Sequence, residues 1–340
     1  MKKTLSLTLA AMLGSSILLS ACGGGEAPSN QGSDQEQSGK TYSFKLTHIT
    51  QPTHVWHKTS EKFNEELQAR SNGRMKVDIF PAGQLGAEKD MVQQLESGTL
   101  EFGIITNAYM STRAEAFNAW SMPFLFKNLE ETTAATKTEP AQKILDELSK
   151  NGIQGLAYLT TGIRQVFMKE GFVDSPEDLK GKKIRVLGSP SILDFWRTVG
   201  AGPTPIPLPE IYTSLQSGVI DGIDIDTDAL FSEKYYEIAK DLTITNHMAF
   251  PGIVVMSKMI HDQMSAEDQK IVAEAMQAAI DWGNQEAIER EHKNLVELKK
   301  LGVNVTELTN TESFNAIRDE VYAKYSANTL IKEFIETIRK

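Results

Sequence analysis

Apolar and polar positions follow two different periods along the chain from residue 41 onward. Short apolar runs predict strands at 44–49, 75–80, 101–105, 153–159, 183–186, 220–225 and 253–256. Helical spacing and helix-end signals predict helices at 55–69, 88–97 and 140–151, and a capping sequence predicts another from 175. Repeated alternation of strand and helix predicts an α/β fold with open sheets rather than a barrel of short strands.

One predicted helix is much longer than the others. Ser265-Ala266-Glu267-Asp268 is a helix-start sequence, no proline follows before Gly302, and only Gly283 interrupts the pattern. The segment predicts a helix of about 35 residues, or on the order of 50 Å, which one small domain cannot cover. We therefore expect a strut that runs across two domains. Two helices broken near Gly283 are the alternative.

The first 22 residues have the features of an export signal. Lys2 and Lys3 precede an apolar stretch at 5–19, which is shorter than the roughly 20 residues needed to span a bilayer. The stretch ends in Leu19-Ser20-Ala21-Cys22, which resembles the lipobox of bacterial lipoproteins. We expect a signal peptide over 1–21 and a fatty-acyl chain such as palmitate on Cys22. An uncleaved N-terminal anchor is the alternative.

The segment that follows Cys22 has no large apolar side chain and is rich in Gly, Ser, Gln and acidic residues. Such a segment cannot bury enough surface to offset its ordering entropy, so 22–40 is predicted to be a lipidated cysteine and a flexible tether. No later segment is long and apolar enough to span a membrane. The sequence therefore predicts a water-soluble body, anchored by lipid on the extracytoplasmic side.

Composition and motifs narrow the classes of function. The 340 residues are enough for about two domains, and the net charge of −10 argues against nucleic-acid binding. Cys22 is the only cysteine, so no internal disulfide can form. The sequence contains no HExxH, GxSxG or SxxK pattern, so an enzyme is the less favoured class and no cofactor is predicted.

Six short segments are spread over residues 44–260: HVWHK (54–58), FPAGQLG (80–86), MPFLF (122–126), LKGKKIRV (179–186), GAGPTP (200–205) and YTSLQSGVIDG (212–222). In this order and spacing they resemble the substrate-binding subunit of tripartite ATP-independent periplasmic (TRAP) transporters, of the dicarboxylate-binding-protein (DctP) type. The predicted export signal and the long helix near the end of the chain agree with this resemblance.

The resemblance implies a two-lobed periplasmic-binding-protein fold, similar to type II, with hinge strands and the long helix touching both lobes. Lobe I would comprise 41–161 with about 250–285, and lobe II would comprise 162–249 with about 286–340. The resemblance also implies that a small organic acid binds in the cleft and that the lobes close over it. The protein would deliver this ligand to a small and a large membrane subunit, driven by sodium rather than by ATP.

Arg185 is the leading candidate for binding the ligand. It lies between Ile184 and Val186 in a predicted strand where burial is expected, and a buried arginine is rarely without a partner. Its planar fork matches a carboxylate with two parallel hydrogen bonds, although a structural salt bridge would satisfy it equally. The resemblance implies that Arg185 binds the ligand carboxylate and that Arg164, two residues after Gly162, is a second contact.

The acidic run from Asp221 to Asp228 is the most individual feature of the sequence. On a strand, Asp224, Asp226 and Asp228 would point to one face. A turn in solvent and a calcium site are the alternatives, although an EF-hand loop starting at Asp224 would need Gly at 229 and Glu at 235. Because carboxylates accept hydrogen bonds, we place Asp224 and Asp226 at the ligand and predict no metal.

The same acidic run bears on the class of ligand. Many relatives in the resembled family carry Glu-Asn where this chain has Asp224-Ile225. An acid is a poor neighbour for a second carboxylate but accepts bonds from hydroxyl groups. We therefore expect a sugar acid or a hydroxy-carboxylate, with a C4-dicarboxylate as the alternative.

Five further side chains fall at strand or loop ends, where binding clefts collect functional groups, and each is as readily a structural residue: His48, Trp56, Asn107, Tyr212 and His247. Trp56 in particular fits the core face of its helix. Three other classes of function stay open, namely a periplasmic enzyme on a two-lobed frame, the binding protein of an ATP-driven importer, and a lipoprotein sensor or adhesin.

Overall fold

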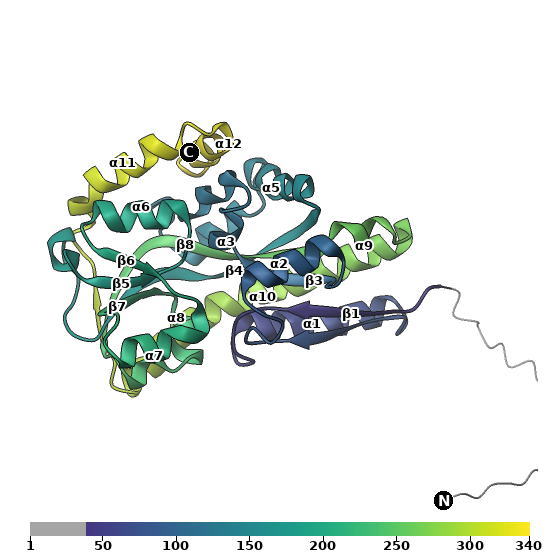
Figure 1. Cartoon of the computed structure of the whole chain (residues 1–340), viewed down its shortest axis with the longest axis horizontal. Coiled ribbons are helices and arrows are strands. Elements are labelled where there is room, and N and C mark those ends of the chain that lie inside the picture. Colours follow the sequence, from purple (N-terminus) through teal and green to yellow (C-terminus); the bar gives the residue numbers. More distant parts are fainter. Residues whose placement is uncertain (1–38) are drawn as a thin grey trace, which may run out of the picture. The chain divides into compact units, whose positions relative to one another are not determined.

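Two strands are far longer than the others and pair along their length. β4 (Ile153–Met168) and β8 (Asp241–Ser257) run antiparallel in the computed structural model, which describes residues 39–340 (Figure 1). Their register shifts at three places, the last of them between residues 164 and 166. The predicted signal peptide, Cys22 and nearly all of the predicted tether lie outside the described residues.

The two long strands join two groups of shorter strands into one sheet. The strand order is β2-β1-β3-β8-β4-β7-β5-β6, and β9 pairs with the beginning of β8. The shorter strands are β1 (Tyr42–Thr47), β2 (Met75–Phe80), β3 (Phe102–Thr106), β5 (Lys183–Val186), β6 (Gly202–Pro205), β7 (Gly222–Ile225) and β9 (Asn304–Glu307). β1–β3 lie at one end and β5–β7 at the other, so β4 and β8 pass between two lobes (Figure 1).

β4 and β8 extend well beyond their predicted ends, through stretches in which buried polar residues interrupt the apolar pattern. The N–H and the hydroxyl of Thr160 both donate to Oδ1 of Asn284, each at 2.8 Å. Oε1 of Gln165 accepts from the N–H groups of Thr245 at 2.8 Å and Asn246 at 3.0 Å. Because other elements satisfy these buried polar groups, the strands continue where the apolar pattern stops.

The helices cover the sheet and follow the predicted alternation. Their bounds are α1 (Val55–Arg70), α2 (Glu88–Ser97), α3 (Asn107–Met110), α4 (Leu129–Ala135), α5 (Glu139–Asp146), α6 (Pro190–Thr198), α7 (Ile211–Gln216), α8 (Thr227–Ser232), α9 (Lys258–Asp262), α10 (Ala266–Lys300), α11 (Asn315–Tyr325) and α12 (Thr329–Ile338). The prediction of one helix over 140–151 was too simple, because α5 gives way to a 3-10 turn at 147–151. The helix predicted from 175 is only a short 3-10 turn.

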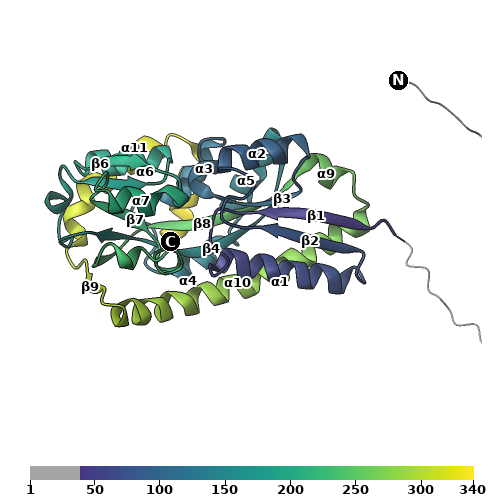
Figure 2. The same cartoon turned by 60° about the horizontal axis from the view of Figure 1, so that its bottom comes forward.

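α10 is one continuous helix of 35 residues, as predicted from its length and start signal. The hydroxyl of Ser265 caps it by accepting the N–H of Asp268 at 3.1 Å. Gly283 does not break it, so the alternative of two helices is wrong. A Cβ at Gly283 would lie 2.3 Å from Oγ1 of Thr59 on α1, so glycine permits this close approach. Figure 2 shows α10 running from the α1 side of the molecule towards β9.

The C-terminal helices pack on different parts of the molecule. α11 packs against α6, whereas α12 packs against α5 and the 3-10 helix η1 (Glu115–Ser121). Phe334 of α12 lies with its ring 4.7 Å from that of Trp120 and 6.1 Å from that of Phe126. Residues from 329 onward therefore differ from the predicted assignment of 286–340 to lobe II. Within residues 39–340, no helix combines the length and apolar character needed to cross a bilayer.

Candidate functional site

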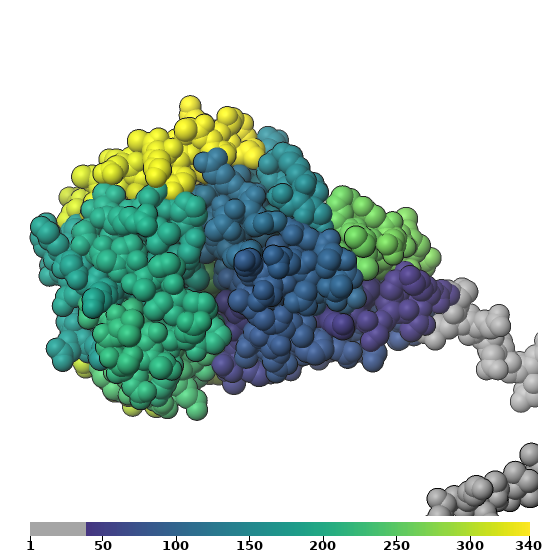
Figure 3. All heavy atoms as spheres, in the orientation of Figure 1, coloured from purple at the N-terminus to yellow at the C-terminus, as the bar shows by residue number. Residues whose placement is uncertain are grey.

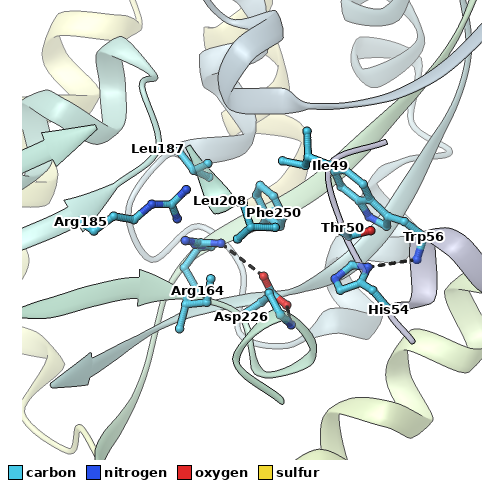
Figure 4. Close-up of a pocket in the computed structure, with 12 residues that line it drawn as sticks. Ile49, Thr50, His54, Trp56, Arg164, Arg185, Leu187, Leu208, Asp226 and Phe250 are labelled. Carbon is cyan, nitrogen blue, oxygen red and sulfur yellow. Dashed lines mark hydrogen bonds and ion pairs between the residues drawn. The ribbon is translucent and has the colours of Figure 1, made fainter. Parts of the chain in front are cut away.

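A small cavity lies where the strands pass between the lobes. Its volume is about 20 Å³. Its lining residues are Ile49, Thr50, His54, Trp56, Arg164, Arg185, Leu187, Leu208, Ile225, Asp226, Ala229 and Phe250 (Figure 4). A groove of about 510 Å³ adjoins it and shares Ile49, Arg185, Leu187 and Leu208. The groove follows the seam between residues 83–89 and 205–210, which is visible on the surface in Figure 3.

Arg185 stands at the junction of the cavity and the groove. It belongs to β5, which lies between β6 and β7, and only 2% of its surface is exposed. Its Nε donates to the carbonyl of Ile206 at 2.9 Å, but its buried Nη1 has no hydrogen-bond partner. Burial, and then the charge of Arg164, lower the pKa of Arg185 to about 10, so the group is still a cation at neutral pH. An unpaired buried cation beside a cavity is suited to bind an anion.

Arg164 is as deeply buried as Arg185, but each of its three guanidinium nitrogens has a hydrogen-bond partner. Its Nε donates to Oδ1 of Asp224 at 2.5 Å, and its Nη2 donates to the backbone carbonyl of the same residue. Its Nη1 donates to Oδ2 of Asp226 at 3.3 Å, and the guanidinium lies 4.8 Å from the ring centroid of Phe250. Arg164 comes directly before the last register shift of β4, next to Gln165, where β4 begins to pair with β7. Its charge is therefore already neutralised by two carboxylates.

Asp224 and His247 lie behind Arg164 and do not line the cavity. Nε1 of Trp196 donates to Oδ2 of Asp224 at 3.0 Å, and Nε2 of His247 lies 3.5 Å from the same oxygen. Burial alone would raise the pKa of Asp224, but Arg164 and His247 hold it well below its usual range. Nδ1 of His247 is 2.7 Å from the hydroxyl of Thr245. These residues support Arg164 from the side away from the cavity.

The acidic run does not continue as a strand. β7 ends at Ile225, and Asp226 caps α8 by accepting the N–H of Ala229 at 2.8 Å. Asp228 lies inside α8, so the prediction that three acids share one strand face is wrong. Asp224, Asp226 and Asp228 are at most 3% exposed, which also excludes the solvated turn. Among residues 39–340, no three His, Cys, Asp or Glu side chains are placed to hold a metal ion together.

Asp228 joins α8 to the first residue of α1 and to α10. Its Oδ2 accepts the N–H of Val55, the first residue of α1, at 2.8 Å. Its Oδ1 accepts from Nδ2 of Asn294 at 2.9 Å and from Nη1 of Arg290 at 3.4 Å, both on α10. Nearby, Nε2 of Gln51 donates to Oε2 of Glu233 at 3.2 Å. The bonds of Val55 to Asp228 and of Gln51 to Glu233 connect the two lobes beside the cavity.

Trp56 and His54 line the cavity from the start of α1. The indole N–H of Trp56 donates to the hydroxyl of Thr161 at 2.5 Å, and its ring stacks on Phe250 with centroids 6.0 Å apart. Nδ1 of His54 accepts the N–H of Trp56 at 3.1 Å, so its hydrogen is carried by Nε2. That Nε2 has no hydrogen-bond partner and lies 3.6 Å from Oδ2 of Asp228.

Besides Asp224 and His247, three more predicted site residues lie outside the walls of the cavity. His48 sits between the hydroxyl of Thr50 at 3.0 Å and Nδ1 of His57 at 3.2 Å, and burial followed by the charge of His57 lowers its pKa to about 3. Nδ2 of Asn107 donates to the hydroxyl of Ser121 at 3.0 Å. The hydroxyl of Tyr212 donates to Glu237 at 3.0 Å.

Glu88 is a polar residue of the groove that the sequence interpretation missed. As the first residue of α2, it accepts the N–H of Thr106 at 2.6 Å and the hydroxyl of the same residue at 3.0 Å. Burial raises its pKa to about 7, against the opposing effects of Thr106 and Arg185. The available signal was an acid at the first position of the helix predicted at 88–97, two residues after FPAGQLG.

Comparison with known proteins places this geometry in a family. Residues 46–328 match the model of the bacterial extracellular solute-binding proteins, family 7. The 2,3-diketo-L-gulonate-binding periplasmic protein of Escherichia coli is 29% identical over 82% of this chain and 85% of its own length. The C4-dicarboxylate-binding protein of Bacillus subtilis is 26% identical over 89% of this chain and 88% of its own length.

A solved structure shares the fold over nearly its whole length. It is a TRAP periplasmic solute binding protein from Sulfitobacter sp. NAS-14.1 with bound β-D-galacturonate. Its TM-score is 0.82 at 28% identity, and the match covers 88% of this chain and 99% of that one. The two-lobed α/β fold predicted from the sequence is confirmed, and the proteins of this comparison bind solutes rather than catalyse reactions. The chain belongs to family 7 of the bacterial extracellular solute-binding proteins, the DctP family.

Proposed function

We propose that this protein captures a small hydroxylated organic acid in the cleft between its lobes and delivers it to a sodium-driven TRAP membrane transporter. The unpaired Nη1 of Arg185 carries the proposal, because it is a buried donor beside the cavity that a ligand carboxylate would satisfy. Arg164 is the weaker candidate for this contact, since Asp224 and Asp226 already occupy it.

Binding requires the lobes to part and close. A cavity of about 20 Å³ has room for roughly one water molecule, whereas a six-carbon acid needs far more space. The hinge would be the stretch of β4 and β8 that carries the register shifts, because strands that change pairing there absorb bending most readily. Bonds from Asp228 to Val55 and from Gln51 to Glu233 would break on opening and re-form on closing.

The walls of the site support a sugar acid. Trp56 and Phe250, which stack on each other, form an aromatic wall against which the apolar side of a sugar ring would pack. Nε2 of His54, the hydroxyl of Thr50 and the carboxyl of Glu88 offer partners for hydroxyl groups. Galacturonate in the Sulfitobacter protein and 2,3-diketo-L-gulonate in the Escherichia coli relative are ligands of this class. A C4-dicarboxylate, named for the Bacillus subtilis relative, is the second candidate.

Lipid anchoring on Cys22 completes the proposal. Leu19-Ser20-Ala21-Cys22 supports it, and family membership supports an extracytoplasmic site of action. Cys22→Ser expressed in the native host should lose lipid labelling and leave the membrane fraction. Retention of that variant in the detergent phase would contradict the anchor without affecting the binding proposal.

A ligand screen tests the binding function. Thermal unfolding should be measured with galacturonate, galactonate, glucuronate, 2,3-diketo-L-gulonate and succinate. A ligand at about 100 times its dissociation constant should stabilise the native state by about 2.7 kcal/mol. At least one hydroxylated acid should do so more strongly than succinate at equal concentration. Tighter binding of succinate than of every hydroxylated acid would favour the second candidate instead.

A further inference from the structure

The charges around the cavity and the groove are balanced before any ligand enters. Their walls contain three cations and three acids: Arg164, Arg185, Lys89, Asp226, Glu88 and Glu210. Asp224 adds a further carboxylate directly behind Arg164. Because Arg164 is bonded to two acids, Arg185 is the one buried cation of these walls with a free donor. The site therefore offers a strong partner to a single carboxylate.

A second carboxylate on the ligand would meet an acid in either direction from Arg185. Towards the cavity lies Asp226, whose carboxylate is 1% exposed and bonded to Arg164. Along the groove lies Glu88, whose oxygens are held by Thr106. Lys89 is exposed, and its charge there is screened by solvent. Like charges placed together in such a site strongly oppose binding.

We propose that Asp226 is a specificity-determining residue, which makes the cleft selective for acids with one carboxylate over acids with two. Its carboxylate cancels the charge that Arg164 would otherwise present to the cavity. This inference rests on the proposed binding function and deepens it, because it names the charge of the ligand. Asp226 also caps α8, so the carboxylate has a structural role that its neutral amide can preserve.

Matched pairs of acids test the proposal. Galactonate and galactarate differ only in a terminal hydroxymethyl group that is a carboxylate in the second, and so do gluconate and glucarate. Butanoate and succinate form a third pair, in which a methyl group becomes the second carboxylate. Calorimetry at pH 8, where all these carboxylates are ionised, should show that the wild-type protein binds the monoacid of a pair more tightly.

Asp226→Asn removes the charge and keeps a side chain that caps helices well. It should shift the monoacid-to-diacid affinity ratio towards the diacid by about tenfold or more. Asp228→Asn removes the same charge two residues away, from a carboxylate that does not line the cavity, and should leave the ratio unchanged even where both affinities fall. Asp226→Ser, which also keeps a capping oxygen, replaces Asp226→Asn if that variant does not fold.

The outcomes distinguish a failure of the role proposed for Asp226 from a failure of the proposed binding function. A wild-type protein that prefers the diacid of its best pair, or a ratio that Asp226→Asn and Asp226→Ser both leave unchanged, contradicts the role of Asp226 while binding itself stands. An equal shift in Asp228→Asn also contradicts it, because the effect would then be one of net charge. Failure of every acid in the three pairs and in the ligand screen to bind contradicts the proposed function.

Discussion

Arg164 and Arg185 are equally buried, at 2% exposure each, yet their surroundings differ completely. Arg164 has its donors bonded to Asp224 and Asp226, whereas Arg185 bonds only to a backbone carbonyl and keeps a buried Nη1 without a partner. The two guanidinium groups face the same cavity (Figure 4). Burial therefore does not distinguish a structural arginine from a binding one, and pairing does.

The two arginines therefore have different roles in the site. Arg164 joins β4 to β7 and to the start of α8 through its two acids, so it holds the floor of the cleft together. Arg185 contributes little to that framework and is available to the ligand. Substitutions at Arg164 and at Arg185 each alter one side of this comparison and leave the other in place.

Arg164→Ala should have the largest effect, and it should fall on stability. Removing one partner of a buried charge pair typically costs about 3–5 kcal/mol, and here two buried carboxylates would lose their cation. Urea unfolding followed by circular dichroism would measure the loss. If Arg164→Ala has wild-type stability, Asp224 and Asp226 do not need this cation. The structural role of Arg164 would then be contradicted.

Arg185→Ala should leave the fold intact and weaken binding of a galacturonate-type acid by about 2–5 kcal/mol, or some 30- to several-thousand-fold. The reason is that the variant removes a cation which is unpaired without ligand but bonded to a carboxylate with it. Calorimetry measures the affinity, and urea unfolding of the same sample serves as the control. Binding within about threefold of wild type would show that another group holds the carboxylate.

Arg185→Lys should show a smaller loss than Arg185→Ala. The ammonium keeps the charge but cannot form two parallel bonds to a carboxylate. Its affinity should therefore lie between those of the wild type and the alanine variant. An affinity equal to that of the alanine variant would show that geometry, and not charge, determines the contact.

The smallest expected effect is the contribution of Glu88 to the pH dependence of stability. Burial raises the pKa of Glu88 from 4.5 to about 7, so the native state holds this proton more tightly than the unfolded state does. Stability should therefore fall as pH rises from about 4.5 to about 7, and change little above that. Glu88→Gln removes this part of the pH dependence, which unfolding curves at several pH values would reveal. If the stability of the wild type and of Glu88→Gln depends on pH in the same way, the raised pKa of Glu88 is contradicted.

Much of the fold was predictable because local signals and tertiary structure agree. β2, α2 and β5 have the predicted bounds, and the capped, proline-free stretch after Ser265 is one helix. The lengths of β4 and β8 were not predictable, because buried polar residues such as Gln165 are satisfied by distant chain segments.

The sequence predicted part of the site, because four candidate residues line the cavity: Arg185, Arg164, Asp226 and Trp56. Arg185 stood out as an arginine in apolar surroundings, Arg164 was named from the family resemblance, and both line the cavity. Asp228 was misplaced, because the strand pattern of alternating acids ends where Asp226 caps a helix. Leu187, Leu208 and Phe250 carry no chemical signature in the sequence, and only the meeting of the two lobes makes them walls of one cavity.

The most direct test of the central claim is a crystal structure of the protein with the tightest-binding acid of the screen. The ligand carboxylate should lie within about 2.7–2.9 Å of Nη1 of Arg185, while Arg164 keeps its bonds to Asp224 and Asp226. A carboxylate held by Arg164 or Lys89, with Nη1 of Arg185 still unbonded, would contradict the assignment of the two arginines.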